Sequence, residues 1–128
     1  MVAENLWGAL PPADDAQSPS AILKAQAALL SETTNDNLRG VTSSERASGK
    51  LVTELSIRVY DMNNYEISLV RASHGAVMYP ASLYNLLEDE YKALECHDEG
   101  EFKEVLGGIL KSEKVQKVIA SLLAQIRN

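Results

Sequence analysis

Hydrophobic and polar side chains alternate regularly in the middle of the chain. In the stretch LVTELSIRVY, Leu55, Ile57 and Val59 fall on one face, with polar residues between them. A second alternating stretch, YEISLVRAS, begins at Tyr65 after the polar segment DMNN. A period of two on both sides of a turn-forming segment is typical of an antiparallel hairpin with one buried face. We therefore expect a sheet at the centre of the fold.

The length of the turn follows from the requirement that the hydrophobic residues of both strands share one face. This requires an odd number of loop residues, because a slip of one residue would turn a whole strand inside out. A three-residue loop is the economical choice, with Asn63 or Asn64 in the left-handed conformation at its last position. The same alternation predicts that Arg71 lies on the hydrophobic face with Leu69 and that Val70 faces solvent.

Helices are predicted before and after this hairpin. Ser18 followed by proline is an N-cap pattern, and the apolar spacing after it predicts a helix that fades at Asn35. Helical spacing predicts a second helix over residues 82–96. Asp98 with a glutamate three positions later is a capping-box pattern, and Ser112 can cap the final helix. That helix carries a continuous apolar stripe, formed by Val115, Val118, Ile119, Leu122, Leu123 and Ile126.

Shorter segments complete the expected fold. Residues 38–42 are predicted to form a short first strand, followed by a mobile polar loop over residues 43–49. Residues 74–79 are a candidate fourth strand that ends at a proline. The order of elements predicts an α+β domain over residues 18–128, in which a small antiparallel sheet of three to four strands packs against the N-terminal helix and the C-terminal helices. Residues 1–17 are predicted to form an irregular arm.

The predicted arm contains three large apolar residues, Leu6, Trp7 and Leu10, and Trp7 is the only tryptophan of the chain. An apolar trio in an otherwise loose arm indicates that the arm is held against another surface. Two interpretations follow: Trp7 packs on the domain's own core, or it docks on another chain. Replacing Trp7 by alanine would lower the melting temperature in the first case and weaken only binding in the second.

Size and composition are those of a single soluble domain. The chain has 128 residues, of which 45% are hydrophobic, enough for one modest core. No apolar run approaches the length of a membrane-spanning helix, so no membrane partner is expected. The early Glu4, with no basic residue around it, does not fit a signal peptide. Cys96 is the single cysteine and cannot form an internal disulfide, and together these features favour a cytoplasmic location.

The charge is negative overall and unevenly distributed. A net charge of −6 argues against nucleic-acid binding, because phosphate contacts need clustered Lys and Arg. Residues 81–110 hold eight acidic residues against two lysines, and Glu88, Asp89 and Glu90 stand in a row among them. Two interpretations are open. The acids form an ordinary solvated helix face, or they dock a basic partner protein, since complementary charge speeds encounter and selects partners.

The residue types that bind metals are few. His74, Cys96 and His97 are the candidate soft or nitrogen ligands, and no CxxC or HExxH spacing occurs. Cys96 and His97 are adjacent, so their side chains would diverge by roughly 100° on a helix. No glycine-rich phosphate loop follows a strand either. We therefore predict no metal site and no cofactor, and we expect Cys96 to be a structural thiol.

Arg71 and His74 have the chemistry of an anion site. An arginine with a histidine three residues on can bind an anion and transfer protons. This pair predicts an anion- or small-molecule-binding module at the end of the hairpin, with a phosphodiester-type hydrolase as a third function. The structural alternative is that Arg71 reaches to water or pairs with Glu54 or Glu66, and that His74 belongs to a turn.

Two segments resemble an uncharacterised family of small bacterial stand-alone proteins. The first, SPSAILKAQAALLSETTNDNLRG, is a proline-started helix with a threonine-rich end. The second, EFKEVLGGILKSEKVQKVIASLLAQ, contains a Ser-Glu-Lys-Val helix restart, and HGAVMYP between them is consistent with the same family. The resemblance implies a bacterial cytoplasmic protein with the α+β order. It implies no activity, ligand or catalytic residue.

These observations favour a non-enzymatic protein-interaction module over an enzyme. The concrete expectation is a small acidic inhibitor or adaptor, of the immunity, antitoxin or regulatory type, that binds a basic partner protein. A homo-oligomer is compatible with each alternative, because the stripe on the last helix can bury against the domain's own core or against a twin helix. The residues predicted to bind the partner are Glu88, Asp89, Glu90, Arg58, Tyr60, Glu66 and Trp7.

Overall fold

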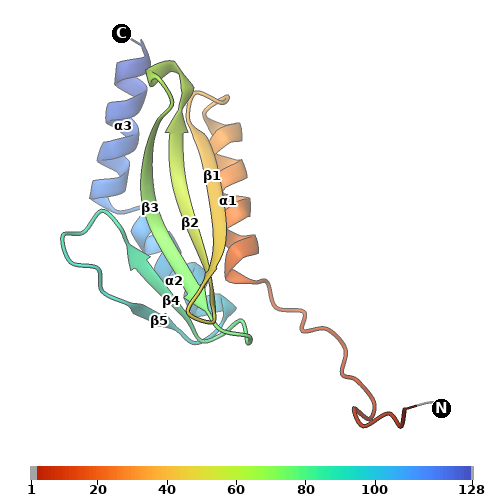
Figure 1. Cartoon of the computed structure of the whole chain (residues 1–128). Coiled ribbons are helices and arrows are strands. Elements are labelled where there is room, and N and C mark those ends of the chain that lie inside the picture. The colour runs from red at the N-terminus through yellow and green to blue at the C-terminus, as the bar shows by residue number, and fades with distance from the viewer. Residues whose placement is uncertain (1–2, 128) are drawn as a thin grey trace.

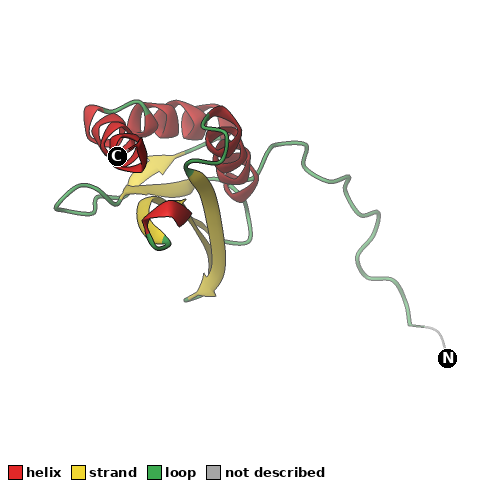
Figure 2. Ribbon diagram, turned by 90° about the horizontal axis from the view of Figure 1, so that it is seen from above, coloured by secondary structure: helices red, strands yellow, loops and turns green. Residues whose placement is uncertain are grey.

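The computed structural model describes residues 3–127 and has an α+β fold, as the sequence predicts. Its five strands form one antiparallel sheet in which each strand pairs with the next along the chain, in the order β1-β2-β3-β4-β5. Figures 1 and 2 show the three helices as a single layer on one side of this sheet, so the other side is open. The elements are α1 (Pro19–Thr33), β1 (Arg39–Ala47), β2 (Lys50–Val59), the short helix η1 (Tyr60–Met62), β3 (Tyr65–His74), β4 (Ala81–Asn85), β5 (Leu94–Cys96), α2 (Glu99–Leu110) and α3 (Glu113–Arg127).

The predicted helix starts are confirmed. Ser18 Oγ accepts a hydrogen bond from the backbone N–H of Ala21 at 3.1 Å, at the start of α1. Asp98 Oδ1 accepts one from the N–H of Glu101 at 2.8 Å, at the start of α2. Ser112 precedes α3 and accepts from a backbone N–H in its first turn. Each side chain satisfies a backbone donor that has no partner within its own helix.

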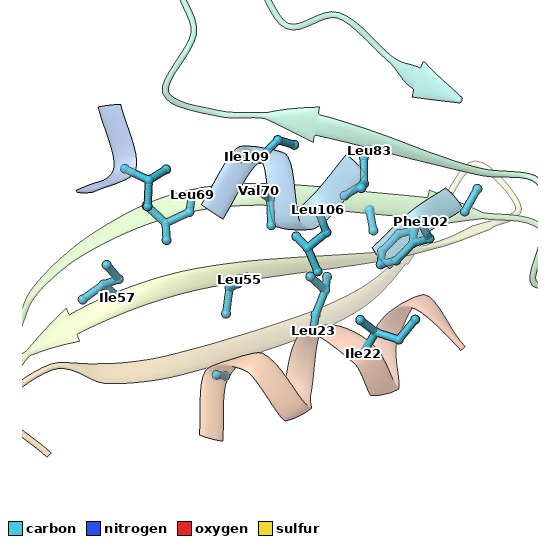
Figure 3. Packing of buried hydrophobic residues seen from close by; sticks show 14 of the residues in the cluster. Ile22, Leu23, Leu55, Ile57, Leu69, Val70, Leu83, Phe102, Leu106 and Ile109 are labelled. Carbon is cyan, nitrogen blue, oxygen red and sulfur yellow. The ribbon is translucent and has the colours of Figure 1, made fainter. Parts of the chain in front are cut away.

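The core lies between the sheet and the helices. Figure 3 shows Leu23 of α1 and Phe102 and Leu106 of α2 directed towards the strands. The side chains of Leu23 and Phe102 are fully buried. Leu55 and Leu83 meet them from the sheet side, which is the arrangement expected of one apolar sheet face covered by amphipathic helices.

The prediction of a helix over residues 82–96 is wrong. This segment forms β4, a loop over residues 86–93 that is exposed from Glu88 onward, and β5. Ala81 and Leu83 face the core while Ser82 between them does not, so a period of two fits the segment as well as helical spacing does. Pairing of β4 with the free edge of β3 decides between the two patterns, because tertiary context overrides helix propensity. The separate strand predicted over residues 74–79 is not formed either: His74 is the last residue of β3, residues 75–79 form no strand, and the fourth strand begins after Pro80.

The prediction of a mobile loop over residues 43–49 is also wrong. β1 continues through this segment to Ala47, paired with β2, so the sheet has five strands where three to four were expected. Residues 43–50 are all exposed, which explains their polar sequence. Ser48 and Gly49 form the connection, with φ of 52° and 77°. Two positive φ values are the requirement of a type I′ turn, which suits the twist of a two-residue hairpin.

A β-bulge changes the expected faces of β3. Leu55 pairs with Val70 while Ser56 pairs with Ser68, so Leu69 is an extra residue on β3. Leu69 and Val70 are therefore both buried. The predictions that Val70 faces solvent and that Arg71 lies on the hydrophobic face are wrong, because the alternation changes phase at the bulge.

The central turn has the predicted parity and a different length. Val59 pairs with Tyr65, so residues 60–64 form a loop with an odd number of residues that is longer than the three expected. The first part of the loop is η1. Asn63 and Asn64 have φ of 59° and 61°, which confirms the left-handed conformation predicted for asparagine here.

Candidate functional site

The loop that joins β4 and β5 carries three of the residues predicted to bind a partner, the consecutive acids Glu88, Asp89 and Glu90. We call residues 86–93 the acidic loop. In Figure 1 it projects from the sheet beside the lower end of α3. Glu88, Asp89 and Glu90 are all exposed. A concavity of about 480 Å³ is lined by Asn85, Glu88, Asp89, Glu90, Lys92 and Leu94.

The base of the acidic loop is held by specific contacts. Leu86 N–H donates to the carbonyl of Leu69 at 2.9 Å. Lys114 Nζ of α3 lies 3.2 Å from Glu88 Oε2 and 3.4 Å from the carbonyl of Leu87. Asp89 and Glu90 have no ion-pair partner within residues 3–127. The loop therefore presents two unneutralised carboxylates on an anchored base.

The other predicted partner-binding residues of the sheet lie around the central turn. Arg58 Nη2 is 2.7 Å from Glu66 Oε1 across the β2–β3 pair. The guanidinium of Arg39 lies 5.4 Å from the centre of the Tyr60 ring. Arg58 and Glu66 thus come together as predicted, but they neutralise each other. They pair near the central turn at the start of β3, whereas β4 pairs with residues 70–73 of β3 and the acidic loop begins beside Leu69.

Arg71 and His74 are not brought together. Arg71 donates to Glu54 Oε2 from Nε at 3.1 Å and from Nη2 at 3.0 Å. His74 is three positions further along β3, so the strand alternation directs it to the opposite face of the sheet. Its Nδ1 lies 2.7 Å from the carbonyl of Gly75, and its Nε2 is buried with no hydrogen-bond partner among the described residues. Of the two interpretations of Arg71, the structure therefore contains the ion pair with Glu54.

Cys96 is buried at the end of β5, although the sequence placed it on a helix. Burial raises the pKa of its thiol to about 11, with nearby carboxylates adding to the effect. The thiol is therefore neutral at physiological pH, which is the state of an unreactive structural cysteine. Within residues 3–127, no cluster of three or more His, Cys, Asp or Glu is arranged to hold a metal ion. Nor does this part of the chain contain a helix with the length and apolar character needed to cross a membrane.

A second hollow, which the sequence did not reveal, runs along α3. We call it the α3 groove. It has a volume of about 560 Å³ and lies between α3 and the start of β3. Its apolar walls are formed by Met62, Tyr65, Ile67, Leu87, Val118 and Leu122, and Lys114 and Lys117 also line it. The sequence signal was the width of the α3 stripe: Val115 and Leu122 are buried in the domain's own core, but Val118, Ile119, Leu123 and Ile126 are only partly covered.

The N-terminal arm leaves its apolar residues exposed. Leu6, Trp7 and Leu10 are 85%, 82% and 72% exposed, so Trp7 does not pack on the domain's own core in this structure. Of residues 3–17, those near the base of the arm contact the domain through hydrogen bonds. There Tyr79 Oη donates to the carbonyl of Gln17 at 2.7 Å, and the N–H of Gln17 donates to Glu99.

The chain matches none of the protein-family models, curated proteins or solved structures with which it was compared. The resemblance of its two helical segments to small bacterial proteins is therefore not supported by a family match.

Proposed function

We propose that this protein is a non-enzymatic interaction module that binds a basic partner protein through its acidic loop, acting in a bacterial cytoplasm as a small inhibitor or adaptor. The observation that carries the proposal is the anchored, projecting loop in which Asp89 and Glu90 are exposed beside a concavity of about 480 Å³ and have no ion-pair partner among residues 3–127. Immunity, antitoxin and regulatory proteins of this kind neutralise or recruit a partner by contact alone.

Electrostatics support a basic partner. Carboxylates on an exposed loop attract cations over roughly one Debye length, about 8 Å at physiological ionic strength. They raise the rate of encounter with basic partners and repel acidic ones. The Glu88–Lys114 contact holds the base of the loop, which reduces the ordering cost that binding must overcome.

The alternative anion-binding function has weaker geometric support. Arg71 is already neutralised by Glu54 in a two-nitrogen contact, and His74 faces the other side of the sheet. An anion would have to displace the carboxylate of Glu54 before it could bind Arg71.

The test compares two pairs of charge reversals. Asp89→Lys with Glu90→Lys removes the unpaired acids and leaves the Glu88–Lys114 contact intact. Glu32→Lys with Glu104→Lys reverses two exposed acids elsewhere and changes the net charge by the same amount, +4, from −6 to −2. Tagged wild-type and variant proteins are used to capture partners from lysate of the source cells, and the captured protein is then purified and titrated by calorimetry.

We expect one basic partner that binds the wild type and the Glu32/Glu104 variant equally and loses affinity for the Asp89/Glu90 variant. The affinity should fall as salt rises, because rim charges act through screened electrostatics. A partner that binds both variants equally, or one whose binding is indifferent to salt, would exclude the acidic loop as the docking surface.

A further inference from the structure

The α3 groove and the apolar residues of the N-terminal arm both expose apolar surface in a single molecule. We propose that the arm of a second copy of this chain docks in the α3 groove, and that two copies exchange arms to form a closed homodimer. This inference goes beyond the proposed function, because it assigns a second surface, which adjoins the acidic loop at Leu87, and an occupant of known sequence.

The apolar surfaces match in kind. The arm presents Leu6, Trp7 and Leu10, each more than two thirds exposed. The groove offers about 560 Å³ between α3 and β3, with Val118 and Ile67 only partly covered. This volume lies in the range of sites that enclose a bound group. Large aromatic side chains that enter apolar pockets are the usual anchors of protein interfaces.

The charges match as well. Residues 3–17 contain Glu4, Asp14 and Asp15 and no lysine or arginine. The groove is bordered by Lys114 and Lys117 of α3. Lys117 has no ion-pair partner among the described residues, so its charge is available to the carboxylate of an incoming arm.

The route of the arm favours a second copy over the arm's own groove. Figures 1 and 2 show the arm leaving the start of α1 and leading away from α3, which lies on the other side of the molecule. Contacts of Tyr79 and Glu99 with Gln17 fix the point from which it departs. Pro11 and Pro12 separate the apolar trio from the domain, and consecutive prolines keep a chain extended.

Arm exchange needs one arm and one groove from each copy, and it closes at two copies. Two copies related by a two-fold axis place each arm in the other's groove, so both contacts are made and none remains open to further copies. The expected product is a dimer and not a filament.

The experiment uses Trp7 as the reporter, since it is the only tryptophan. Sedimentation velocity of the purified full chain should show a concentration-dependent dimer, and tryptophan emission should shift to shorter wavelength over the same range. Trp7→Ala and Val118→Asp should each weaken self-association by about tenfold or more, as expected for loss of an interface anchor. Val77→Asp is the matched control, because Val77 is 73% exposed on a loop outside the groove, and this variant should dimerise normally.

A mixing experiment separates a second copy from the chain's own arm. Val118→Asp keeps Trp7 and loses the groove, whereas Trp7→Ala keeps the groove and is silent in tryptophan fluorescence. Adding the Trp7→Ala protein to the Val118→Asp protein should shift the emission of the latter, because its arm enters the intact groove.

The proposal is overturned if the wild type is monomeric at all concentrations, if the dimer survives Trp7→Ala, or if mixing produces no shift. A monomer whose tryptophan emission is shifted to shorter wavelength would mean that the arm folds onto its own domain, and this result would also overturn the proposal.

Circular dichroism must show that Val118→Asp is folded. If it is unfolded, Lys117→Glu takes its place as the groove variant, with the same predicted loss. The Asp89/Glu90 variant should dimerise like the wild type, so failure here is distinguishable from failure of the acidic-loop proposal.

Discussion

Gly40 of β1 lies directly against the backbone of Ala27 in α1. A Cβ atom added to Gly40 would stand 2.5 Å from the Cα of Ala27, closer than real Cβ atoms come to other heavy atoms, and closer still to the Ala27 carbonyl oxygen. The obstacle is backbone, so no rotamer change can relieve it. This contact sets how closely α1 approaches the sheet, and through α1 it sets the position of the core leucine Leu23.

We predict that Gly40→Ala destabilises the domain by about 1–3 kcal/mol or more, the usual cost of overpacking a core. Gly108→Ala is the matched control. Gly108 lies within α2, and a Cβ there would meet no atom within 4 Å, so the substitution should stabilise the domain by about 0.5–1 kcal/mol. Urea unfolding monitored by circular dichroism measures both. Equal effects of the two substitutions would refute the close approach of β1 and α1.

The cap of α2 gives a second prediction. Asp98 Oδ1 accepts the Glu101 N–H at 2.8 Å, and the carboxylate also lies at the positive end of the helix dipole. Asp98→Ala should lower the free energy of unfolding by about 0.5–2 kcal/mol, and Asp98→Ser should recover most of the loss because a hydroxyl still accepts the hydrogen bond. A serine variant no more stable than the alanine variant would show that the cap contributes through charge alone.

Local signals in the sequence predicted the local features of the fold. Ser18, Asp98 and Ser112 were identified as caps, and Asn63 and Asn64 as left-handed turn residues, because each depends on a few neighbouring atoms. The run of acidic residues at 88–90 is likewise apparent from the sequence alone.

Features that depend on distant partners were missed. The bulge at Leu69 arises from pairing between β2 and β3, and no local pattern distinguishes it from regular alternation. It reversed the expected faces of Val70 and Arg71. Arg71 and His74 are separated for another reason: β3 continues to His74, and residues three positions apart on a strand face opposite sides of the sheet. The conversion of the predicted 82–96 helix into β4, loop and β5 likewise depends on the free edge of β3. The width of the α3 stripe indicates that part of it stays uncovered, but the place of the α3 groove also depends on Met62, Tyr65 and Ile67, which α3 meets only in the folded chain.

His97 and Glu101 predict a response to mild acid. Hydrogen bonding to the Glu101 carboxylate, 2.9 Å from His97 Nδ1, raises the pKa of His97 above its usual 6.5. The stability that this contact supplies is therefore present below pH 6.5 and is lost as pH rises through the pKa of the folded state. Glu101→Gln should lower the pKa of His97 as measured by NMR titration, whereas Glu104→Gln, on the same helix, should leave it unchanged. If both substitutions shift the titration equally, the effect is one of general helix charge.

Alkaline pH should weaken the fold through the buried thiol of Cys96 and the partly buried phenol of Tyr79. Burial raises the pKa of Cys96 from 9.0 to about 11 and that of Tyr79 from 10.0 to about 12. The folded state therefore holds protons that the unfolded chain releases, so stability is complete below pH 9 and declines as pH rises, first through Cys96 and then through Tyr79. We expect the free energy of unfolding to fall from pH 9 to pH 11, as followed by urea titrations at fixed ionic strength over this range. Tyr79→Phe removes one ionisable group and the hydrogen bond to Gln17, so it should lower stability at neutral pH but flatten the decline above pH 10. Tyr91→Phe, at an exposed tyrosine, should change neither quantity. A decline of the same steepness in Tyr79→Phe and the wild type would show that Tyr79 does not carry its share of the alkaline loss.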